Sequence, residues 1–273
     1  MNRYLLVVTL LLYIGCGGEA NRSEELFSSP LPIYNQAYQE NFESDTIDKI
    51  LKQAHDAYVL VDPFEKGVVP YIATIQANNN QVGGYISVGT GEDWREDFSE
   101  LAPYLSSEVW DAWKGEYYVS QTTTGIEEVM RRRIDKMSNW GIDWVEFDNM
   151  DWWDEETKKR YNLELTQHQA TAYINNLCAY VHQKGMKCMA KNSVEGFALF
   201  DGVLYESYPN RKNWWDFEGM QQFLAQKKLV IINHYNEANC DDVYEEYRDD
   251  YKSEAISFIC EDTQQQAYRH YNQ

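Results

Sequence analysis

The sequence has little positive charge. Lysine and arginine number 24, against 44 aspartates and glutamates, and the formal net charge is −20 at pH 7. An acidic surface repels nucleic acid and anionic lipid headgroups, so neither is an expected partner. The same charge would attract a cationic partner, although solubility alone would also account for it. No G-x-G-x-x-G motif or P-loop follows the first strand-like segment, so nucleotide binding has no support.

Cysteine is also scarce, with five in the chain, and no pair has the spacing of a metal knuckle. Cys178 lies in a helical pattern and Cys188 in a strand pattern, which predicts two small core residues. An exported chain permits disulfides, and Cys240 and Cys260 are the pair that we expect to form one.

The apolar run near the N-terminus, from Leu5 to Ile14, is too short to span a bilayer comfortably. It follows Arg3 and ends at Gly15-Cys16, which predicts a signal peptide over residues 1–16. A bacterial lipoprotein signal with a lipidated Cys16 is the favoured interpretation, and an ordinary cleaved signal is the alternative. We expect a polar tether at 17–40 and a location in the periplasm or at the cell surface, with Cys16 as the membrane attachment if it is lipidated.

No low-complexity block, proline- and glycine-rich linker or short repeat divides the remaining chain. Strand-like apolar runs alternate with helical patterns over residues 41–273. This alternation predicts a single α/β domain, a closed parallel (β/α)8 barrel of the TIM type, with a doubly wound open sheet as the alternative. The eight runs are Tyr58–Val61, Tyr85–Val88, Tyr117–Val119, Asp143–Phe147, Met186–Ala190, Val203–Tyr205, Leu229–Ile232 and Ile256–Cys260.

Helical spacing of apolar residues is clearest over 126–137 and over 165–181, where Gly185 is the expected stop. An acidic surface helix is predicted from Asp241 to Lys252. The stretch from Thr90 to Glu116 is less regular and is expected to be a long loop with a short helix.

Polar residues follow each predicted strand, at the edge where barrels of this type place their active sites. Solvated loops are polar too, but acids, amides, one lysine and several aromatic residues converging on one rim favour a site. The residues are Asp62, Glu92, Asp93, Ser120, Asp148, Asn149, Lys191, Asn192, Glu206, Asn233, His234, Glu261 and Asp262.

An ordered set of motifs at these strand ends resembles glycoside hydrolase family 114, the endo-α-1,4-polygalactosaminidases. The resemblance covers about Tyr58 to Tyr235, and its residues are Val61-Asp62-Pro63-Phe64-Glu65, Tyr85-Ile86-Ser87-Val88-Gly89, Glu92-Asp93-Trp94-Arg95, Val145-Glu146-Phe147-Asp148-Asn149-Met150-Asp151, Leu165-Thr166 with Gln169 and Tyr173, Lys191-Asn192 and Tyr205-Glu206. It implies a (β/α)8 fold, cleavage of α-linked galactosamine or N-acetylgalactosamine polymers, and catalytic carboxylates at Asp148 and Glu206.

Three positions depart from the family pattern: Ser120 replaces an aspartate, Ser193 replaces an aspartate, and His234 stands where a glutamate is usual. These departures keep both expected catalytic acids but leave the exact sugar, linkage and acetylation preference open. They motivate one alternative, a non-catalytic carbohydrate-binding barrel. A metal-assisted hydrolase that uses the acids and His234 is a further possibility.

By analogy with other α-glycosidase barrels, Asp148 is the expected nucleophile and Glu206 the general acid/base. We expect a two-carboxylate retaining mechanism, with an inverting mechanism as the alternative that the sequence leaves open, and neither needs a cofactor or metal. We expect a monomer that binds a cationic amino-sugar polysaccharide. The expected substrate-binding residues are Asp62, Glu92, Asp93, Asn149, Trp152, Trp153, Lys191, Asn192, Tyr208 and His234.

Each of these residues also has a structural interpretation. Asp62 could cap the chain before Pro63, Lys191 could form a structural salt bridge, and His234 could be a buried structural residue. Trp94 is a further candidate for sugar stacking, whereas Trp140 and Trp144 are expected in the core. Glu146 shares the strand face of Asp148 and is expected to be an interior acid that supports the site.

Overall fold

The computed structural model describes residues 30–37, 44–209, 216–250, 255–261 and 268–272. The predicted signal peptide, Cys16 and most of the predicted tether lie outside these residues, as does Asp262. Within the described part of the chain, no helix is both long and apolar enough to cross a membrane.

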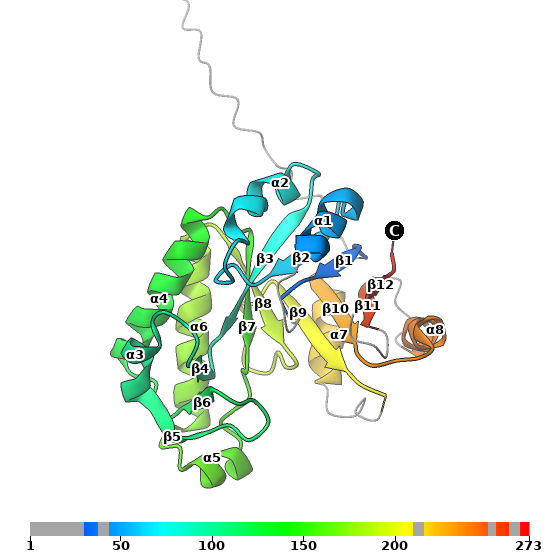
Figure 1. The fold of residues 1–273 in the computed structure, drawn as a ribbon. Helices are drawn as coiled ribbons and strands as arrows, with labels where there is room; N and C mark the ends of the chain where they lie inside the picture. The colour runs from blue at the N-terminus through cyan, green and yellow to red at the C-terminus, as the bar shows by residue number, and fades with distance from the viewer. Residues whose placement is uncertain (1–29, 38–43, 210–215, 251–254, 262–267, 273) are drawn as a thin grey trace, which may run out of the picture.

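A nine-stranded sheet in the order β1-β2-β3-β7-β8-β9-β10-β11-β12 forms the centre of the molecule (Figure 1). Its first eight strands pair in parallel and nearly close into a barrel, while β12 pairs antiparallel with β11. The strands are β1 (Ile33–Asn35), β2 (Tyr58–Val61), β3 (Gln81–Ser87), β7 (Trp144–Asp148), β8 (Lys187–Lys191), β9 (Gly202–Ser207), β10 (Leu229–His234), β11 (Ile256–Glu261) and β12 (Tyr268–His270).

The predicted barrel is confirmed, but one barrel strand was missed and one predicted strand lies outside the barrel. The first barrel strand is β1, which lies inside the segment predicted as a tether, so ordered structure begins before residue 41. The predicted third strand, Tyr117–Val119, belongs to β6 (Glu116–Val119) of a separate antiparallel sheet. Apolar alternation identifies a strand but not its partner, and β1 is too short to show a period. From β7 onward the predicted barrel positions hold.

The second sheet is an insertion between β3 and β7. It has the order β4-β6-β5, with β4 at Thr90–Glu92 and β5 at Leu105–Val109, and the helix α3 (Phe98–Leu101) and a 3-10 turn (Ala102–Tyr104) precede β5. The segment expected to be an irregular loop therefore contains a small sheet, which Figure 1 places beside α5 (Glu155–Tyr161).

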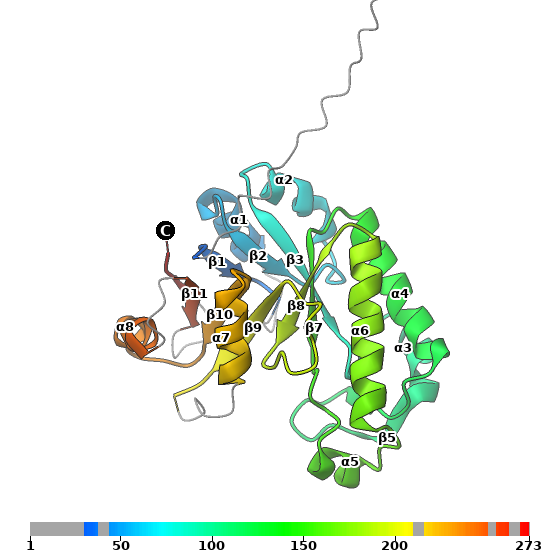
Figure 2. The same ribbon diagram turned by 180° about the vertical axis from the view of Figure 1, so that it is seen from behind.

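Helices cover the outside of the barrel. The two predicted long helices are confirmed as α4 (Thr124–Asn139) and α6 (Gln167–Gln183), which Figure 2 shows side by side. A capping box between Thr166 and Gln169 begins α6, and Gly185, at φ +77°, follows its end. The others are α1 (Ser44–Gln53), the 3-10 turn Val69–Tyr71, α2 (Ile72–Gln76), α7 (Phe217–Ala225) and the acidic α8 (Cys240–Asp250).

Apolar side chains form two clusters, one inside the barrel and one between the sheet and the helices. The inner cluster includes Tyr58, Trp144, Met189 and Ile231, and it fills the lumen below the strand ends. Trp144 is buried as predicted, and Trp140 packs partly buried against the outer cluster. The packed lumen leaves the C-terminal strand ends as the place for polar chemistry.

Two disulfides tie helices to neighbouring strands. The predicted pair Cys240–Cys260 joins the start of α8 to β11. Cys178 and Cys188 are buried as expected, but they also form a disulfide, which joins α6 to β8. The prediction of two small core residues is confirmed by their burial, but the disulfide between them was missed, because a helical and a strand pattern do not reveal that the two sulfur atoms meet.

Candidate active site

Strand pairing brings charged residues to one level at the carboxyl ends of β7, β8 and β9. Asp148 pairs in register with Ser87, and Glu206 pairs with Asn233. Because alternate residues of a strand share a face, Glu146 lies on the same side as Asp148. Glu146 is fully buried in the barrel, as predicted for an interior acid.

Lys191 lies at the centre of this group. Its Nζ is 3.2 Å from Asp148 Oδ1, 3.2 Å from Glu206 Oε1 and 3.8 Å from Glu146 Oε1. Burial disfavours the charged ammonium, but the three carboxyl groups outweigh this effect and raise the pKa of Lys191 well above its usual range. Lys191 is therefore a permanent cation shared by the three acids.

Asp148 is held by donors from three parts of the chain. Its Oδ2 accepts a hydrogen bond from Tyr85 OH at 3.0 Å, and its Oδ1 accepts one from the Asn149 backbone N–H at 2.8 Å, beside Lys191. Asn149 adopts φ +56°, and its amide donates to Ser87 Oγ at 2.9 Å. Asn149 thus holds the loop that orients Asp148.

Glu206 is oriented mainly by Asn192. The Asn192 Nδ2 donates to Glu206 Oε2 at 3.2 Å, and its Oδ1 accepts from the Glu206 backbone N–H at 2.8 Å. Tyr235 OH donates to Glu206 Oε1 at 3.3 Å. Asn192, at φ +64°, resembles Asn149 in this respect, since asparagine tolerates the left-handed region and follows a charged residue of the site in both places.

Glu146 differs from its two neighbours in protonation. Burial, together with the nearby Asp148 and Glu206, raises the pKa of Glu146 to about 8, against the opposing effect of Lys191. Glu146 is therefore mostly neutral at pH 7. With Lys191 positive, the group balances its charge when only one of Asp148 and Glu206 is ionised.

A cavity of about 770 Å³ opens above these groups. It contains seven of the predicted site residues, Asp148, Asn149, Trp152, Lys191, Asn192, Glu206 and Tyr208. The remaining lining residues are Trp110, Ala112, Trp113, Tyr118, Met150, Asp151, Asp154 and Thr157. Trp110, Trp113 and Tyr118 were not selected from the sequence. The two tryptophans lie in the stretch that was expected to be a long loop with a short helix, and Tyr118 lies in a strand that was predicted for the barrel.

Asp62 and Glu92 lie elsewhere, in a buried ion-pair network. Arg95 binds Asp62 through Nη1 and Nη2 at 3.1 and 2.7 Å, and Glu92 through Nε and Nη2 at 2.9 and 2.8 Å. Arg133 lies 3.7 Å from Glu92. Neither acid lines the cavity, and nor do the exposed Asp93 and Trp94.

Three other predicted contacts have structural partners. Trp152 borders the cavity but is buried and donates its Nε1–H to the Val119 carbonyl at 2.8 Å. Trp153 packs against the core and is not among the lining residues. His234 is fully buried, with Nδ1 2.6 Å from Ser207 Oγ and Nε2 3.4 Å from Glu237 Oε2, which matches the structural interpretation of this histidine.

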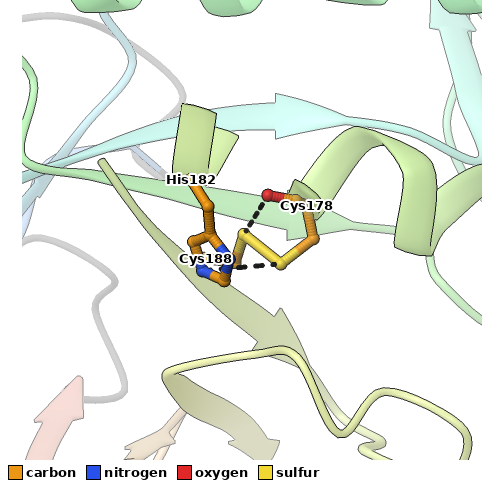
Figure 3. A group of neighbouring side chains, drawn as sticks. All are labelled: Cys178, His182 and Cys188. Carbon is orange, nitrogen blue, oxygen red and sulfur yellow. Dashed lines mark hydrogen bonds between the residues drawn. A yellow bond between two sulfur atoms is a disulfide. The ribbon is translucent and has the colours of Figure 1, made fainter. Parts of the chain in front are cut away.

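Among the described residues, Cys178, His182 and Cys188 are of types that can bind a metal ion, and their potential ligand atoms lie within 4.8 Å of one another (Figure 3). His182 Nε2 also lies 2.8 Å from Asp201 Oδ2. The two sulfur atoms are joined in a disulfide, and a cysteine ligates metal as a thiolate. The group lies outside the cavity lining.

Two carboxylates at the strand ends of a (β/α)8 barrel, beneath a large open cavity, have the arrangement of a glycoside hydrolase site. The family model for glycoside-hydrolase family GH114 matches residues 30–273. The chain therefore belongs to this family and is a glycoside hydrolase.

Solved structures share the fold at low sequence identity. Ega3 of Aspergillus fumigatus, solved with galactosamine, is 19% identical with a TM-score of 0.72, over 88% of this chain and 95% of that one. The glycoside hydrolase domain of PelA from Pseudomonas aeruginosa, variant E218A, is 12% identical with a TM-score of 0.63, over 87% and 97%. A comparison with curated proteins found no match.

Proposed function

We propose that the chain is an exported, endo-acting glycoside hydrolase that cleaves α-1,4-linked galactosamine or N-acetylgalactosamine polymers. The observation that carries the proposal is the pair Asp148 and Glu206, which both line the cavity and each lie 3.2 Å from Lys191 Nζ. Family membership supports the reaction class, and the galactosamine bound to Ega3 supports the sugar.

Hydrogen bonding favours Asp148 as the ionised nucleophile and Glu206 as the general acid/base. Asp148 accepts from Asn149 and Tyr85 at 2.8 and 3.0 Å, whereas the side-chain donors to Glu206 are at 3.2 and 3.3 Å. Shorter bonds to the charged form stabilise it more strongly. Lys191 balances one negative charge, which suits a site with one carboxylate and one carboxylic acid.

The proposed reaction has two steps. Asp148 attacks the anomeric carbon while Glu206 donates its proton to the departing glycosidic oxygen, which gives a glycosyl ester on Asp148. Glu206, now ionised, then takes a proton from a water molecule whose oxygen attacks the same carbon and releases Asp148. Both acids return to their starting protonation, and the anomeric configuration is retained.

The separation of the acids favours this retaining course. Asp148 Oδ1 and Glu206 Oε1 each lie 3.2 Å from the same nitrogen, so they are at most twice that distance apart. Retaining enzymes hold their carboxyl groups ~5–5.5 Å apart, and inverting enzymes need ~6.5–9.5 Å to admit a water molecule.

The acidic chain suits a cationic polymer, because deacetylated galactosamine units carry ammonium groups. Export is inferred from the apolar run after Arg3, and lipid attachment at Cys16 is part of the same proposal. Chelator should leave activity unchanged, because the proposed steps use only side chains and water.

The test is incubation of the purified protein with partly deacetylated galactosaminogalactan, with reducing ends counted over time. We expect new reducing ends, and we expect the Glu206→Gln variant to produce none while it still binds the polymer. NMR of the first products should show the α-anomer before mutarotation. Bound polymer without cleavage by the wild-type protein would refute the hydrolase, and an initial β-anomer would refute retention.

A further inference from the structure

The aromatic end of the cavity comes from the insertion between β3 and β7, not from the barrel strands. Residues 110–115 connect β5 to β6 in a compact turn, in which the Trp110 N–H donates to the Glu116 carbonyl at 2.7 Å and the Glu116 N–H donates to the Trp113 carbonyl at 3.1 Å. Trp110 and Trp113 line the same cavity as Asp148 and Glu206. One continuous space therefore joins these indoles to the proposed catalytic acids.

Trp113 is 59% exposed, although burial of a large indole is favourable. Its ring centre lies 6.5 Å from that of Trp110, which lies 5.0 Å from that of Tyr118. Tyr118 in turn lies 4.8 Å from Tyr161 on α5. The rings form a series that begins at the buried Tyr161 of α5 and ends with the exposed indole of Trp113 at the cavity.

The position of this series is fixed by contacts with α5. Tyr161 OH donates to Asp111 Oδ2 at 3.0 Å and accepts from the Asp111 N–H at 3.2 Å, and Arg160 pairs with Asp111. Figure 1 shows β5, β6 and α5 grouped at one end of the molecule. A ring held in place before a ligand arrives loses little conformational entropy on binding.

We infer that Trp110 and Trp113 form a sugar-stacking subsite for a unit of the polysaccharide chain beyond the bond that is cleaved. This inference rests on the proposed function. The C–H face of a sugar ring is apolar and fits an indole, and a protonated amino group adds a cation–π attraction. The cavity volume lies in the upper part of the ~300–1,000 Å³ range that encloses drug-sized ligands, which are larger than a single sugar.

A subsite that touches a non-reacting unit stabilises the bound substrate and the transition state alike, so its loss should raise KM more than it lowers kcat. Trp113→Ala should raise KM for long galactosamine oligomers about tenfold, with kcat within about twofold of wild type. The shortest oligomers that are cleaved do not reach Trp113, so their KM should not change. Trp113→Phe should restore most of the affinity for long oligomers.

Trp94 provides a matched control, because it is 53% exposed on the same insertion but lies outside the cavity lining. Trp94→Ala should leave KM unchanged at every chain length. An unchanged KM for Trp113→Ala at all lengths, or an equal loss with Trp94→Ala, would overturn the subsite. Circular dichroism checks that the variants are folded.

Calorimetric titration of galactosamine oligomers separates this inference from the proposed function, because it needs no turnover. The comparison is Glu206→Gln against the double variant Glu206→Gln, Trp113→Ala. Affinity that falls about tenfold in the double variant supports the subsite, even if the wild-type protein forms no reducing ends. Equal affinity in the two variants, with cleavage by the wild type intact, refutes the subsite and leaves the hydrolase in place.

Discussion

Two clusters of charged side chains lie at the C-terminal ends of the barrel strands, and they differ in how acids and cations are matched. In the cluster after β2 and β3, every carboxylate faces a guanidinium. Arg95 donates hydrogen bonds to both Asp62 and Glu92. Arg133 binds Asp97 through two hydrogen bonds at 2.7 and 2.8 Å. These groups are engaged with one another and lie outside the cavity lining.

In the cluster after β7, β8 and β9, the single cation Lys191 serves three carboxyl groups, and two of these open into the cavity. The acids there cannot all be ionised without excess negative charge, and burial raises the pKa of Glu146 to about 8, so Glu146 keeps its proton at neutral pH. In the first cluster each carboxylate forms hydrogen bonds with a guanidinium, which holds the side chains in place. In the second cluster one ammonium is shared by three carboxyl groups, which leaves groups able to exchange protons. Asp62 and Glu92 therefore have a structural role, whereas Asp148 and Glu206 are available for the reaction, although all four follow barrel strands in the sequence.

The largest effect should come from neutralising the two open acids. Asp148→Asn and Glu206→Gln should each lower kcat at least about 10³-fold, because one removes the nucleophile and the other the proton donor. Reducing-end assays measure the loss, and thermal unfolding checks that Tm stays near the wild-type value. Near-normal turnover in either variant would remove that residue from its role.

Removing a guanidinium from the cluster after β2 and β3 should lower the stability of the protein and leave its catalytic activity unchanged. Arg95→Met leaves Asp62 and Glu92 buried without their guanidinium, which should lower the free energy of unfolding by about 3–5 kcal/mol. The control is Arg132→Met, whose pair with Glu100 is about half exposed and should be worth less than about 1 kcal/mol. Urea titration gives both values. A loss of activity per folded molecule in Arg95→Met would mean that the cluster of Arg95, Asp62 and Glu92 takes part in the reaction.

Lys191→Met should affect the reaction through both open acids. Without the shared cation, we expect kcat to fall about 10²-fold, a typical loss for one preorganised electrostatic contact. The acidic limb of the pH–rate profile should move to higher pH, because an ionised carboxylate is harder to form without Lys191. Lys184→Met, which breaks a surface pair with Asp135, should leave the profile in place. An unshifted profile in Lys191→Met would make Lys191 a purely structural residue.

The last prediction concerns the effect of pH on stability, which leaves the reaction itself unchanged. The pKa of Glu146 rises from 4.5 to about 8 on folding, so the folded state holds a proton that the unfolded chain has lost between these values. This contribution to stability is complete below pH 4.5 and declines as pH rises to about 8, by up to about 1.4 kcal/mol for each pH unit. Glu146→Gln should flatten that decline in urea titrations at several pH values and keep activity near wild type at pH 6. An unchanged slope would show that another group titrates.

Much of the fold was predictable, because apolar periodicity marks elements that are long enough to repeat. The strands from β7 to β11 and the helices α4 and α6 were identified in this way. The same pattern misplaced Tyr117–Val119 in the barrel, since a strand in an insertion has the same alternation. It could not reveal β1, which has three residues.

The candidate site was predictable where neighbouring strands bring residues together, as with Asp148, Lys191 and Glu206. The ion pair between Asp62 and Arg95 could not be inferred, because the two residues are far apart in the sequence. Asp62 was therefore predicted to bind substrate, although its role in the structure is to pair with Arg95. Trp113 lay in a stretch without periodicity. Its only sequence signal was the aromatic density of the segment from Trp110 to Tyr118.

The two disulfides have a practical consequence for anyone who produces this enzyme. Cys178–Cys188 and Cys240–Cys260 join residues 10 and 20 positions apart, and loops of such size stabilise a fold by roughly 3 kcal/mol each when closed. In a reducing cytosol neither disulfide would form, and the half of the barrel that carries Lys191 and Glu206 would lose the stabilisation from both. Active protein should therefore be obtained most readily by export to an oxidising compartment, or by expression in a host that supplies a disulfide isomerase in an oxidising cytosol.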